Sequence, residues 1–449
     1  YAVRHQGCTA GVVITASHNP AKYNGYKVYW AHGGQAAPEQ AAAIYACIGK
    51  VPFFSAKTCD FDAAVRDGRI GMIGAEEDAA YYEVTRSVLL APALLKEKGA
   101  TLPIVYTPLH GAGNIPVRTL LQQAGMTQVF VVPEQELPDG TFPTVTAPNP
   151  ENPDAFRLAK ALADEKGATV ILATDPDSDR LGVAVKRHDG EWAVLSGNQI
   201  ACILLEHILS GRKAQGTLPN NGVVVKSIVS TTLADAIAAR YGAALENVLT
   251  GFRFISEKID AYEKSGEKTF LFGFEESYGF LAGGFSRDKD AICAAVLAAE
   301  ACLCYAERGM TLYDALQEIY RSYGFYKEKQ TSYTLEGKEG MERIARCMSG
   351  LRAAPPEMFA GVRVNVFEEY KTGVRVARGK TPERIELPRS DMLRFLLEDG
   401  AWVVVRPSGT EPKLKLYIGA NAAKEDALDA LLGRLFDDLD ALLRRELRM

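Results

Sequence analysis

The sequence predicts an α/β protein made of several domains, and two observations support this. The chain has 449 residues, which is too long for one hydrophobic core and corresponds to about three or four domains of ordinary size. Apolar strands alternate with helical stretches along most of the chain, in the strand, helix, strand order that builds α/β sheets. Beyond Tyr326 the pattern changes to strands and a last amphipathic helix. We therefore expect three α/β domains followed by one α+β domain.

The expected domains end at turn-rich or unpatterned segments. The first strand follows the start of the chain within about a dozen residues, so we expect the first domain to be N-terminally incomplete. The expected domain boundaries are 1–97, 98–215, 216–325 and 326–449. We expect strands at 11–15, 26–30, 102–107, 127–132, 168–173, 181–185, 222–226, 268–273, 331–335, 361–367, 402–406 and 414–418. We expect helices at 38–48, 78–95, 117–124, 154–166, 198–209, 232–241, 255–264, 288–308, 312–323 and over the leucine-rich stretch 428–442.

Composition excludes several classes of protein. The hydrophobic fraction of 47% and charged fraction of 24% are those of a folded globular chain. A net charge of −5 argues against nucleic acid as the main partner. No uninterrupted apolar stretch reaches the roughly 20 residues of a membrane span, the N-terminus lacks signal-peptide order, and the eight cysteines form no C-x-x-C pair. We expect a cytoplasmic protein with reduced thiols and no membrane or nucleic-acid partner.

The first loop that could carry chemistry follows strand 11–15. It places the hydroxyl of Ser17 beside His18, at the carboxyl end of a buried strand, where open α/β sheets bind ligands. A reactive serine is one interpretation, and a polar link between strand and turn is the other. Lys27 follows the Asn-Gly turn and could reach back over the loop, although alone it also fits a solvated lysine.

The second loop carries three carboxylates at alternate positions directly after an apolar strand. Asp175, Asp177 and Asp179 repel one another unless a cation lies between them. Oxygen ligands favour a hard ion, and Mg²⁺ with few protein ligands fits better than a full calcium cage. An exposed acidic turn is the alternative. Arg180 ends the loop.

Two further loops offer groups that bind sugars and phosphates. Glu275, Glu276 and Ser277 follow an apolar strand and could bind sugar hydroxyls, although this loop by itself fits an ordinary acidic turn better. The segment from Arg406 to Lys413 lies between two strands and could cradle a phosphate, unless it is a hairpin loop with incidental charges. Its candidate ligands are Arg406, Ser408, Gly409, Thr410 and Lys413.

In this order and spacing, the four loops resemble those of the α-D-phosphohexomutases, the phosphoglucomutase and phosphomannomutase family. The resemblance covers nearly the whole chain. It implies three related, doubly wound α/β domains and a C-terminal α+β domain around a central cleft. It also implies a phosphoglucomutase that interconverts glucose 1-phosphate and glucose 6-phosphate, through phosphorylated Ser17 and a bound 1,6-bisphosphate. Small-molecule sugar phosphates are the implied partners, with glucose 1,6-bisphosphate as activator.

The resemblance assigns roles to the loop residues. Ser17, Asp175, Asp177 and Asp179 match the family's magnesium ligands, and His18, Lys27 and Arg180 match positions that assist phosphoryl transfer. Glu275 and Ser277 match sugar-contacting positions, and the stretch that includes Gly251 and Arg253 matches the family's other sugar-recognition loop. The Glu-Glu-Ser version is similar to the branch of bacterial α-phosphoglucomutases and phosphopentomutase.

Alternative functions stay open at this point. Phosphopentomutase or phosphomannomutase activity would use the same machinery. Family members carry a Gly-x-Arg-Gly type turn before the serine loop, and this chain has none, so a non-catalytic sugar-phosphate-binding fragment is a further possibility. The acidic loop also resembles that of the haloacid-dehalogenase phosphotransferases, with Asp175 as nucleophile and Asp177 as acid/base.

Overall fold

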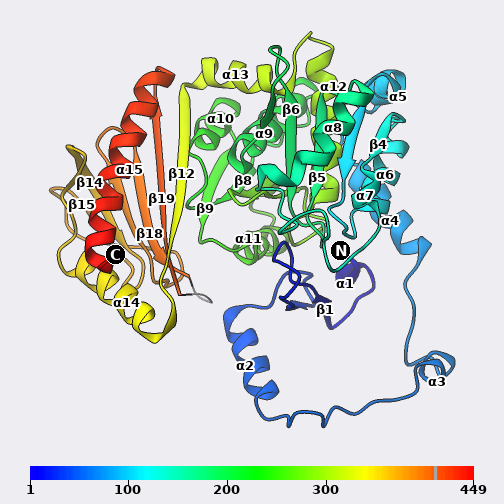
Figure 1. The fold of residues 1–449 in the computed structure, drawn as a ribbon, viewed down its shortest axis with the longest axis horizontal. Helices are drawn as coiled ribbons and strands as arrows, with labels where there is room; N and C mark the ends of the chain where they lie inside the picture. The colour runs from blue at the N-terminus through cyan, green and yellow to red at the C-terminus, as the bar shows by residue number, and fades with distance from the viewer. Residues whose placement is uncertain (409–411) are drawn as a thin grey trace. The chain divides into compact units, whose positions relative to one another are not determined.

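The structure is a computed structural model that describes residues 1–408 and 412–449 (Figure 1). It divides into two compact units, and each is described by itself. The first unit comprises Tyr1–Ser227, Ala238–Asn247 and Gly251–Ala315, and the second comprises Ile228–Ile237, Val248–Thr250 and Leu316–Met449. None of the helices in the described ranges is long and apolar enough to cross a membrane.

The first unit begins with a two-stranded antiparallel sheet. Strands β1 (Ala10–Ile14) and β2 (Tyr26–Trp30) pair so that Val13 lies opposite Lys27. Gly25 makes the connection possible, because a Cβ at this position would lie 2.2 Å from the carbonyl oxygen of Thr15. The pairing therefore brings Lys27 back over the loop that follows β1. The helices of this region are α1 (Ala2–His5), α2 (Pro38–Ile48), α3 (Phe61–Arg66), α4 (Ala75–Arg86) and α5 (Pro92–Lys98).

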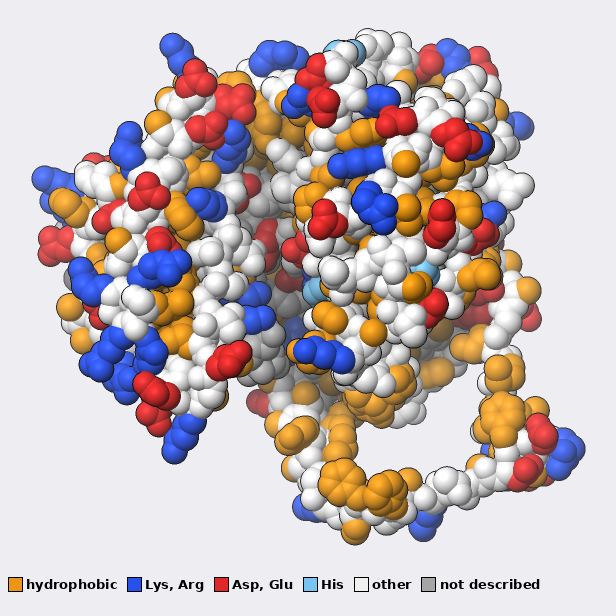
Figure 2. Space-filling view, viewed as in Figure 1, with side chains coloured by type: hydrophobic (Ala, Val, Ile, Leu, Met, Phe, Trp, Pro, Cys, Tyr) orange, Lys and Arg blue, Asp and Glu red, His pale blue; other side chains and the backbone are white. Residues whose placement is uncertain are grey.

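The segment between α2 and α3 carries apolar side chains on its surface. Val51, Phe53 and Phe54 are exposed there, and Figure 2 shows hydrophobic side chains along this segment. This part of the first unit therefore contributes little to its buried core.

The second sheet of the first unit has the strand order β4-β3-β5-β6-β7. Its first three strands are parallel and its last three are antiparallel. The strands are β3 (Ile104–Thr107), β4 (Val129–Val131), β5 (Val170–Thr174), β6 (Leu181–Lys186) and β7 (Trp192–Val194). The helices are η1 (Gly99–Thr101), α6 (Asn114–Gln123), α7 (Pro133–Glu136), η2 (Pro153–Phe156), α8 (Arg157–Lys166) and α9 (Gly197–Ala214). Strand β5 is buried along its whole length, as a central strand of an α/β sheet should be.

The third sheet has the order β11-β10-β8-β9, with β8 and β10 parallel and β11 antiparallel to β10. Its strands are β8 (Gly222–Ser227), β9 (Ala244–Val248), β10 (Thr269–Glu275) and β11 (Gly279–Ala282). The helices that accompany it in sequence are α10 (Leu233–Tyr241), α11 (Phe252–Ser265), α12 (Ala291–Ala306) and α13 (Leu312–Tyr323). In the second sheet the buried strand β5 ends directly before Asp175, and in the third sheet the strand β10 ends at Glu275, the first residue of the predicted sugar loop.

The second unit is built on an antiparallel sheet with the order β12-β19-β18-β17-β14-β15-β16, and β13 pairs with β14. The strands are β12 (Phe325–Thr334), β13 (Met358–Phe359), β14 (Val362–Glu369), β15 (Val374–Ala377), β16 (Glu383–Arg384), β17 (Leu393–Leu397), β18 (Trp402–Pro407) and β19 (Lys413–Ala422). Helices α14 (Gly337–Ala353) and α15 (Glu425–Leu447) supply apolar side chains to its core. The expected α+β character of this region is observed.

Some expected elements were wrong in extent. The helix expected at 78–95 is two helices, because Pro92 starts a new one and the carboxylate of buried Glu300 accepts the backbone N–H groups of Leu90 and Ala91. Helix α9 continues past residue 209 to Ala214. The longer elements that the sequence pattern did not reveal include β9, β17 and α14, and several short helices and strands, among them β7 and β11, were also not expected.

Candidate active site

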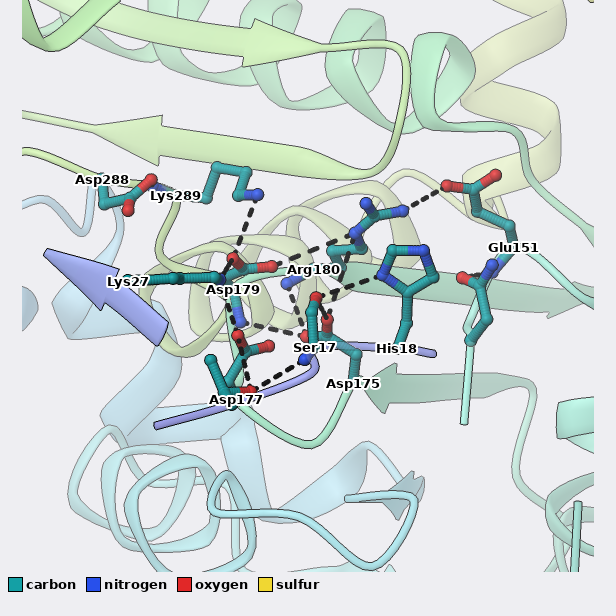
Figure 3. Close-up of polar contacts among 12 residues, drawn as sticks. Ser17, His18, Lys27, Glu151, Asp175, Asp177, Asp179, Arg180, Asp288 and Lys289 are labelled. Carbon is teal, nitrogen blue, oxygen red and sulfur yellow. Dashed lines mark hydrogen bonds and ion pairs between the residues drawn. The ribbon is translucent and has the colours of Figure 1, made fainter. Parts of the chain in front are cut away.

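Ser17 lies three residues beyond the end of β1 in a constrained conformation. Its φ is 54°, a left-handed value that is uncommon for a residue other than glycine and that occurs often at functional sites. The hydroxyl of Thr15 accepts the backbone N–H of Ser17 at 2.8 Å. The Ser17 hydroxyl then lies 3.1 Å from Asp175 Oδ2 and 3.1 Å from His18 Nδ1 (Figure 3).

The three aspartates come from the loop between β5 and β6. Asp175, Asp177 and Asp179 each offer a carboxylate oxygen, and these atoms lie within 4.8 Å of one another. Asp175 is fully buried, and its Oδ1 accepts the backbone N–H groups of Asp179 at 3.0 Å and Arg180 at 2.9 Å. These two hydrogen bonds close the loop around the Asp175 side chain. The carboxylates therefore converge instead of spreading into solvent.

Three cationic side chains surround the carboxylates (Figure 3). Lys27 Nζ donates to Asp177 Oδ2 at 2.7 Å and to Asp179 Oδ2 at 3.1 Å. Lys289 Nζ lies 3.0 Å from Asp179 Oδ2. The Arg180 guanidinium lies 4.0 Å from the nearest oxygens of Asp175 and Asp179.

Burial and neighbouring charges shift the carboxylate pKa values in opposite directions. Burial, followed by the charges of Asp179 and Asp177, raises the pKa of Asp175 well above its usual range. Burial also opposes ionisation of Asp179, but the charges of Lys289 and Lys27 outweigh it and hold the pKa of Asp179 below its usual range. The two lysines thus compensate Asp179 far better than Asp175.

Burial and charge also act on the basic groups. Burial, followed by the positive charge of Arg180, lowers the pKa of His18 to about 4. The imidazole facing Ser17 is therefore neutral at pH 7. Burial opposes the charge of Lys289, but Asp179 raises its pKa, so Lys289 stays a cation.

The aspartate cluster fits a divalent metal ion. Asp177 Oδ1 and Asp179 Oδ1 are buried oxygens without a hydrogen-bond partner in the described structure. Two such orphaned carboxylate oxygens are costly unless a cation satisfies them. Oxygen donors at this spacing suit Mg²⁺, which binds through a few carboxylates and a phosphate oxygen.

The predicted sugar loop lies against the aspartate loop. Arg180 forms a β-bridge with Gly279, and the backbone N–H of Leu181 donates to the carbonyl of Tyr278 at 3.0 Å. Ser277, which precedes Tyr278, is partly exposed. The structure therefore joins the second and third predicted loops.

Two of the predicted sugar-binding positions are also joined to each other. The buried carboxylate of Glu275 accepts the backbone N–H of Gly251 at 2.7 Å. Two residues further on, the guanidinium of Arg253 stacks over the ring of Phe254, 4.8 Å from its centroid, and its Nε is buried without a hydrogen-bond partner in the described structure.

Gly279 gives Lys289 its path to the aspartates. A Cβ at position 279 would lie 2.2 Å from Lys289 Cδ and 2.7 Å from its Cγ. Nonbonded carbon atoms do not approach this closely, so only glycine leaves room for the lysine stem. Gly279 is the first residue of β11.

The predicted phosphate loop connects β18 and β19 in the second unit. The backbone N–H of Ser408 donates to the carbonyl of Lys413 at 2.7 Å, and Arg406 pairs with Lys415 across the two strands. Arg406, Ser408 and Lys413 therefore belong to one hairpin. Gly409 and Thr410 lie outside the described residues.

The sequence patterns missed several residues around the serine. Lys289 is the most important of them, and Asp288 beside it accepts hydrogen bonds from Tyr29 Oη at 2.7 Å and Gln35 Nε2 at 2.9 Å. Glu151 pairs with Arg180. The sequence feature that could have pointed to Lys289 is a run of four charged residues, 287–290. This run directly precedes a helix that contains a single charged residue.

Comparison with known proteins agrees with this geometry. Models of the phosphoglucomutase/phosphomannomutase family match the chain in order: alpha/beta/alpha domain I at residues 1–54, domain II at 81–190, domain III at 196–323 and the C-terminal domain at 362–433. The chain is 35% identical over 430 residues to a phosphoglucomutase of Staphylococcus saprophyticus subsp. saprophyticus, covering 95% of this chain and 76% of that protein. The chain belongs to the phosphoglucomutase/phosphomannomutase family.

Solved structures of phosphohexomutases share the fold. The open form of the phosphoglucomutase pp63/parafusin from Paramecium is 17% identical, with a TM-score of 0.68 over 99% of this chain and 80% of that one. N-acetylphosphoglucosamine mutase of Aspergillus fumigatus, in complex with GlcNAc-6P and magnesium, is 14% identical, with a TM-score of 0.54 over 98% of this chain and 90% of that one.

Family membership confirms the expected fold class and the expected enzyme class, a phosphohexomutase. Membership of this family argues against the dehalogenase alternative, in which Asp175 would be the nucleophile. The structure also argues against it, because the Asp175 carboxylate is fully buried and its Oδ1 accepts hydrogen bonds from two backbone N–H groups. The expected domain boundaries, the roles of the site residues and the cytoplasmic location stay predictions.

Proposed function

We propose that this member of the phosphoglucomutase/phosphomannomutase family interconverts glucose 1-phosphate and glucose 6-phosphate through phosphorylated Ser17. The observation that carries the proposal is the position of the Ser17 hydroxyl, 3.1 Å from an aspartate of a three-carboxylate cluster and within a ring of three cations. A phosphoryl group on Ser17 would enter an arrangement already built for phosphate chemistry. The match to phosphoglucomutases at about 35% identity supports glucose as the sugar.

The reaction balances as two phosphoryl transfers. In the first, the free 6-hydroxyl of glucose 1-phosphate attacks phospho-Ser17, the Ser17 Oγ–P bond breaks, and glucose 1,6-bisphosphate forms. In the second, Ser17 Oγ attacks phosphorus at position 1 of the reoriented bisphosphate, which leaves glucose 6-phosphate and restores phospho-Ser17. Glucose 1,6-bisphosphate added from solution phosphorylates Ser17 in the same way and acts as activator.

The surrounding side chains supply positioning and charge, which are the main needs of phosphoryl transfer. The ammonium groups of Lys27 and Lys289 lie within 3.1 Å of aspartate oxygens, and Arg180 is paired with Glu151. Because these three cations are already fixed in place, they need not reorganise during phosphoryl transfer. Bound Mg²⁺, held by Asp175, Asp177, Asp179 and an oxygen on Ser17, would supply Lewis-acid stabilisation of the transferring phosphate.

Proton transfer falls to groups beside Ser17. Each phosphoryl transfer removes one proton from the attacking hydroxyl and gives one to the departing oxygen. His18 Nδ1 lies within hydrogen-bond reach of Ser17 Oγ, and Lys27 approaches the same loop from β2. We assign these two residues to general acid–base work. Glu275, Ser277, Gly251 and Arg253 are the proposed contacts to the sugar.

The loop between β18 and β19 is the proposed site for the phosphate that is not transferred. Arg406, Ser408 and Lys413 come from one hairpin, and a guanidinium, a hydroxyl and an ammonium are suitable phosphate ligands. Gly409 and Thr410 complete the assignment made from the sequence.

The test is conversion of glucose 1-phosphate to glucose 6-phosphate with Mg²⁺ and catalytic glucose 1,6-bisphosphate. Ser17→Ala should abolish turnover and the phosphoserine signal in mass spectrometry of the intact protein. Ser55→Ala, at an exposed turn serine, is the matched control and should retain full activity. Activity of Ser17→Ala equal to that of the wild type would refute the proposal. Complete inactivity of the wild type would favour the non-catalytic, sugar-phosphate-binding function instead.

The same assay separates the possible sugars. Glucose 1-phosphate, mannose 1-phosphate and a pentose 1-phosphate should be compared by kcat/KM under identical conditions. We expect glucose 1-phosphate to be preferred. A higher kcat/KM for the pentose or mannose phosphate would move the assignment to phosphopentomutase or phosphomannomutase without changing the proposed chemistry.

A further inference from the structure

The second unit contains a cavity, and none of the proposed catalytic residues lines it. The cavity has a volume of about 540 Å³ and lies where strands β13, β14 and β15 meet the segment that follows α14. This volume is within the range of pockets that hold small organic molecules. The labels β14 and β15 mark its neighbourhood in Figure 1.

Strand register explains which side chains share the cavity. Met358 pairs with Arg363, and Phe367 pairs with Val376. The backbone N–H of Arg378 donates to the carbonyl of Asn365 at 2.8 Å, so these two residues also lie side by side.

Positions 363, 365 and 367 lie on β14, and positions 376 and 378 lie on or directly after β15; all of them line the cavity. A β-bulge between Val364 and Val366 interrupts the alternation of faces along β14, so that Phe367 packs against the same core as Val364.

The lining has a polar part and an apolar part. The polar part consists of the exposed side chains of Arg363, Asn365 and Arg378, together with exposed Glu357. The apolar part includes Phe367 and Val376, and the Phe367 ring packs on Phe395 with centroids 5.1 Å apart. The cavity therefore combines two guanidinium groups, an amide and one carboxylate with an apolar, partly aromatic floor.

The two arginines lack the acidic partners that their neighbours have. Arg375, on the same strand as the cavity wall, pairs with Glu368 and Glu383, and Arg394 also pairs with Glu368. Within the described ranges, the guanidinium groups of Arg363 and Arg378 make no hydrogen bond or ion pair. Their positive charge is available to an anion from solution.

We propose that this cavity is a binding site for a nucleoside phosphate, separate from the site that contains Ser17. Arg363 and Arg378 would bind the phosphate, and Asn365 would donate to one of its oxygens or to the ribose. The base would lie on Phe367 and Val376, where its flat ring would cover the apolar floor of the cavity.

Each chemical group of this ligand is complementary to one part of the cavity lining. Inorganic phosphate would satisfy the arginines but leave the apolar floor in water. A purely apolar molecule would cover the floor but leave two cations without an anion. A phosphate joined through a sugar to a flat ring matches both the guanidinium groups and the apolar floor.

Calorimetric titration of the full chain with AMP tests the proposal, with adenosine and inorganic phosphate as separate probes. Saturating glucose 1-phosphate should be present throughout, so that phosphate sites elsewhere are occupied. AMP should bind, and each of adenosine and phosphate should bind at least tenfold more weakly. Equal affinity for AMP and inorganic phosphate would overturn the proposal, as would the absence of AMP binding at millimolar concentration.

Variants locate the binding. Arg363→Ala and Arg378→Ala should each weaken AMP about tenfold or more, because each removes a charge-assisted hydrogen bond. Arg384→Ala, at an exposed arginine of β16, is the matched control and should change affinity less than twofold. Val376→Asp should abolish binding by placing a carboxylate on the floor. Unchanged AMP affinity in both cavity arginine variants would show that AMP binds elsewhere and would overturn the proposal.

These variants keep the proposal independent of the proposed function. The cavity residues are not part of the proposed catalytic machinery, and the binding titration does not require turnover. Loss of AMP binding with intact mutase activity supports the site, whereas failure of the mutase assay leaves the binding result unaffected.

Discussion

Replacement of Gly279 by alanine tests whether Lys289 is required at the aspartate cluster. The new Cβ would lie 2.2 Å from Lys289 Cδ, so the lysine stem must leave its path or the strand must shift. Either movement separates Lys289 Nζ from Asp179, which now lies 3.0 Å away. The substitution changes a residue that carries no side chain, yet it should damage the charge balance of the site.

The size of the effect follows from the bond that is lost. A hydrogen bond between charged groups contributes about 1.5–3 kcal/mol, so kcat/KM should fall about 10- to 150-fold. Overpacking should also lower the free energy of unfolding by about 1–3 kcal/mol. Circular dichroism at the assay temperature must therefore show that Gly279→Ala is folded while its activity is lost.

A double-mutant cycle separates the lysine from general damage. In Lys289→Met the charge is absent from the start, so adding Gly279→Ala should reduce kcat/KM only slightly further. Gly140→Ala is the matched control, because a Cβ there has no neighbour within 4 Å. Full activity in folded Gly279→Ala, or a full additional loss in the Lys289→Met background, would refute the reasoning.

The remaining predictions concern metal affinity, the core and pH. Asp177→Asn should weaken Mg²⁺ binding at least tenfold in a metal titration, because it removes a charge from an orphaned pair of oxygens. Leu435→Ala, at a fully buried position of α15, should lower the free energy of unfolding by about 2–5 kcal/mol in urea. Burial opposes ionisation of Glu246, but hydrogen bonds from Lys258 and Lys268 lower its pKa to about 2. The ionised carboxylate therefore stabilises the fold above pH 5, and this contribution, about 1 kcal/mol after solvent screening, is lost as the pH falls toward 2. Glu246→Gln should remove that part of the acid sensitivity in urea denaturation compared at pH 6 and pH 3.

The sequence predicted the chemistry well wherever a loop directly follows a short apolar strand. Ser17 follows β1 and Asp175 follows β5, and both strands are visible as short apolar runs. The expectation that the strand before Ser17 is buried was wrong, because β1 is mostly exposed whereas β5 is buried. Lys27 was recognised as able to reach back because the Asn-Gly turn implies a hairpin, and the pairing of Val13 with Lys27 realises this. Local patterns and simple turn chemistry were sufficient in these cases.

The sequence could not predict contacts that depend on tertiary structure. Lys289 reaches Asp179 only because β11 presents a glycine beside its stem. The break before α5 depends on Glu300, which is more than 200 residues away and accepts the N–H groups at the helix start. In the second unit, only the pairing of β13, β14 and β15 brings Arg363 and Arg378 to one cavity.

The geometry of Asp175 links the metal to the phosphoserine. Lys27 and Lys289 pair directly with Asp177 and Asp179, whereas the nearest cation to Asp175 is Arg180, at 4.0 Å. Asp175 is thus the least compensated carboxylate of the cluster and also the one that contacts the Ser17 hydroxyl. A phosphate on Ser17 would add negative charge where positive charge is scarcest, and at such distances in a buried site the repulsion amounts to several kcal/mol. A divalent cation between the two groups would reverse this interaction, so metal binding and phosphorylation of Ser17 should each favour the other.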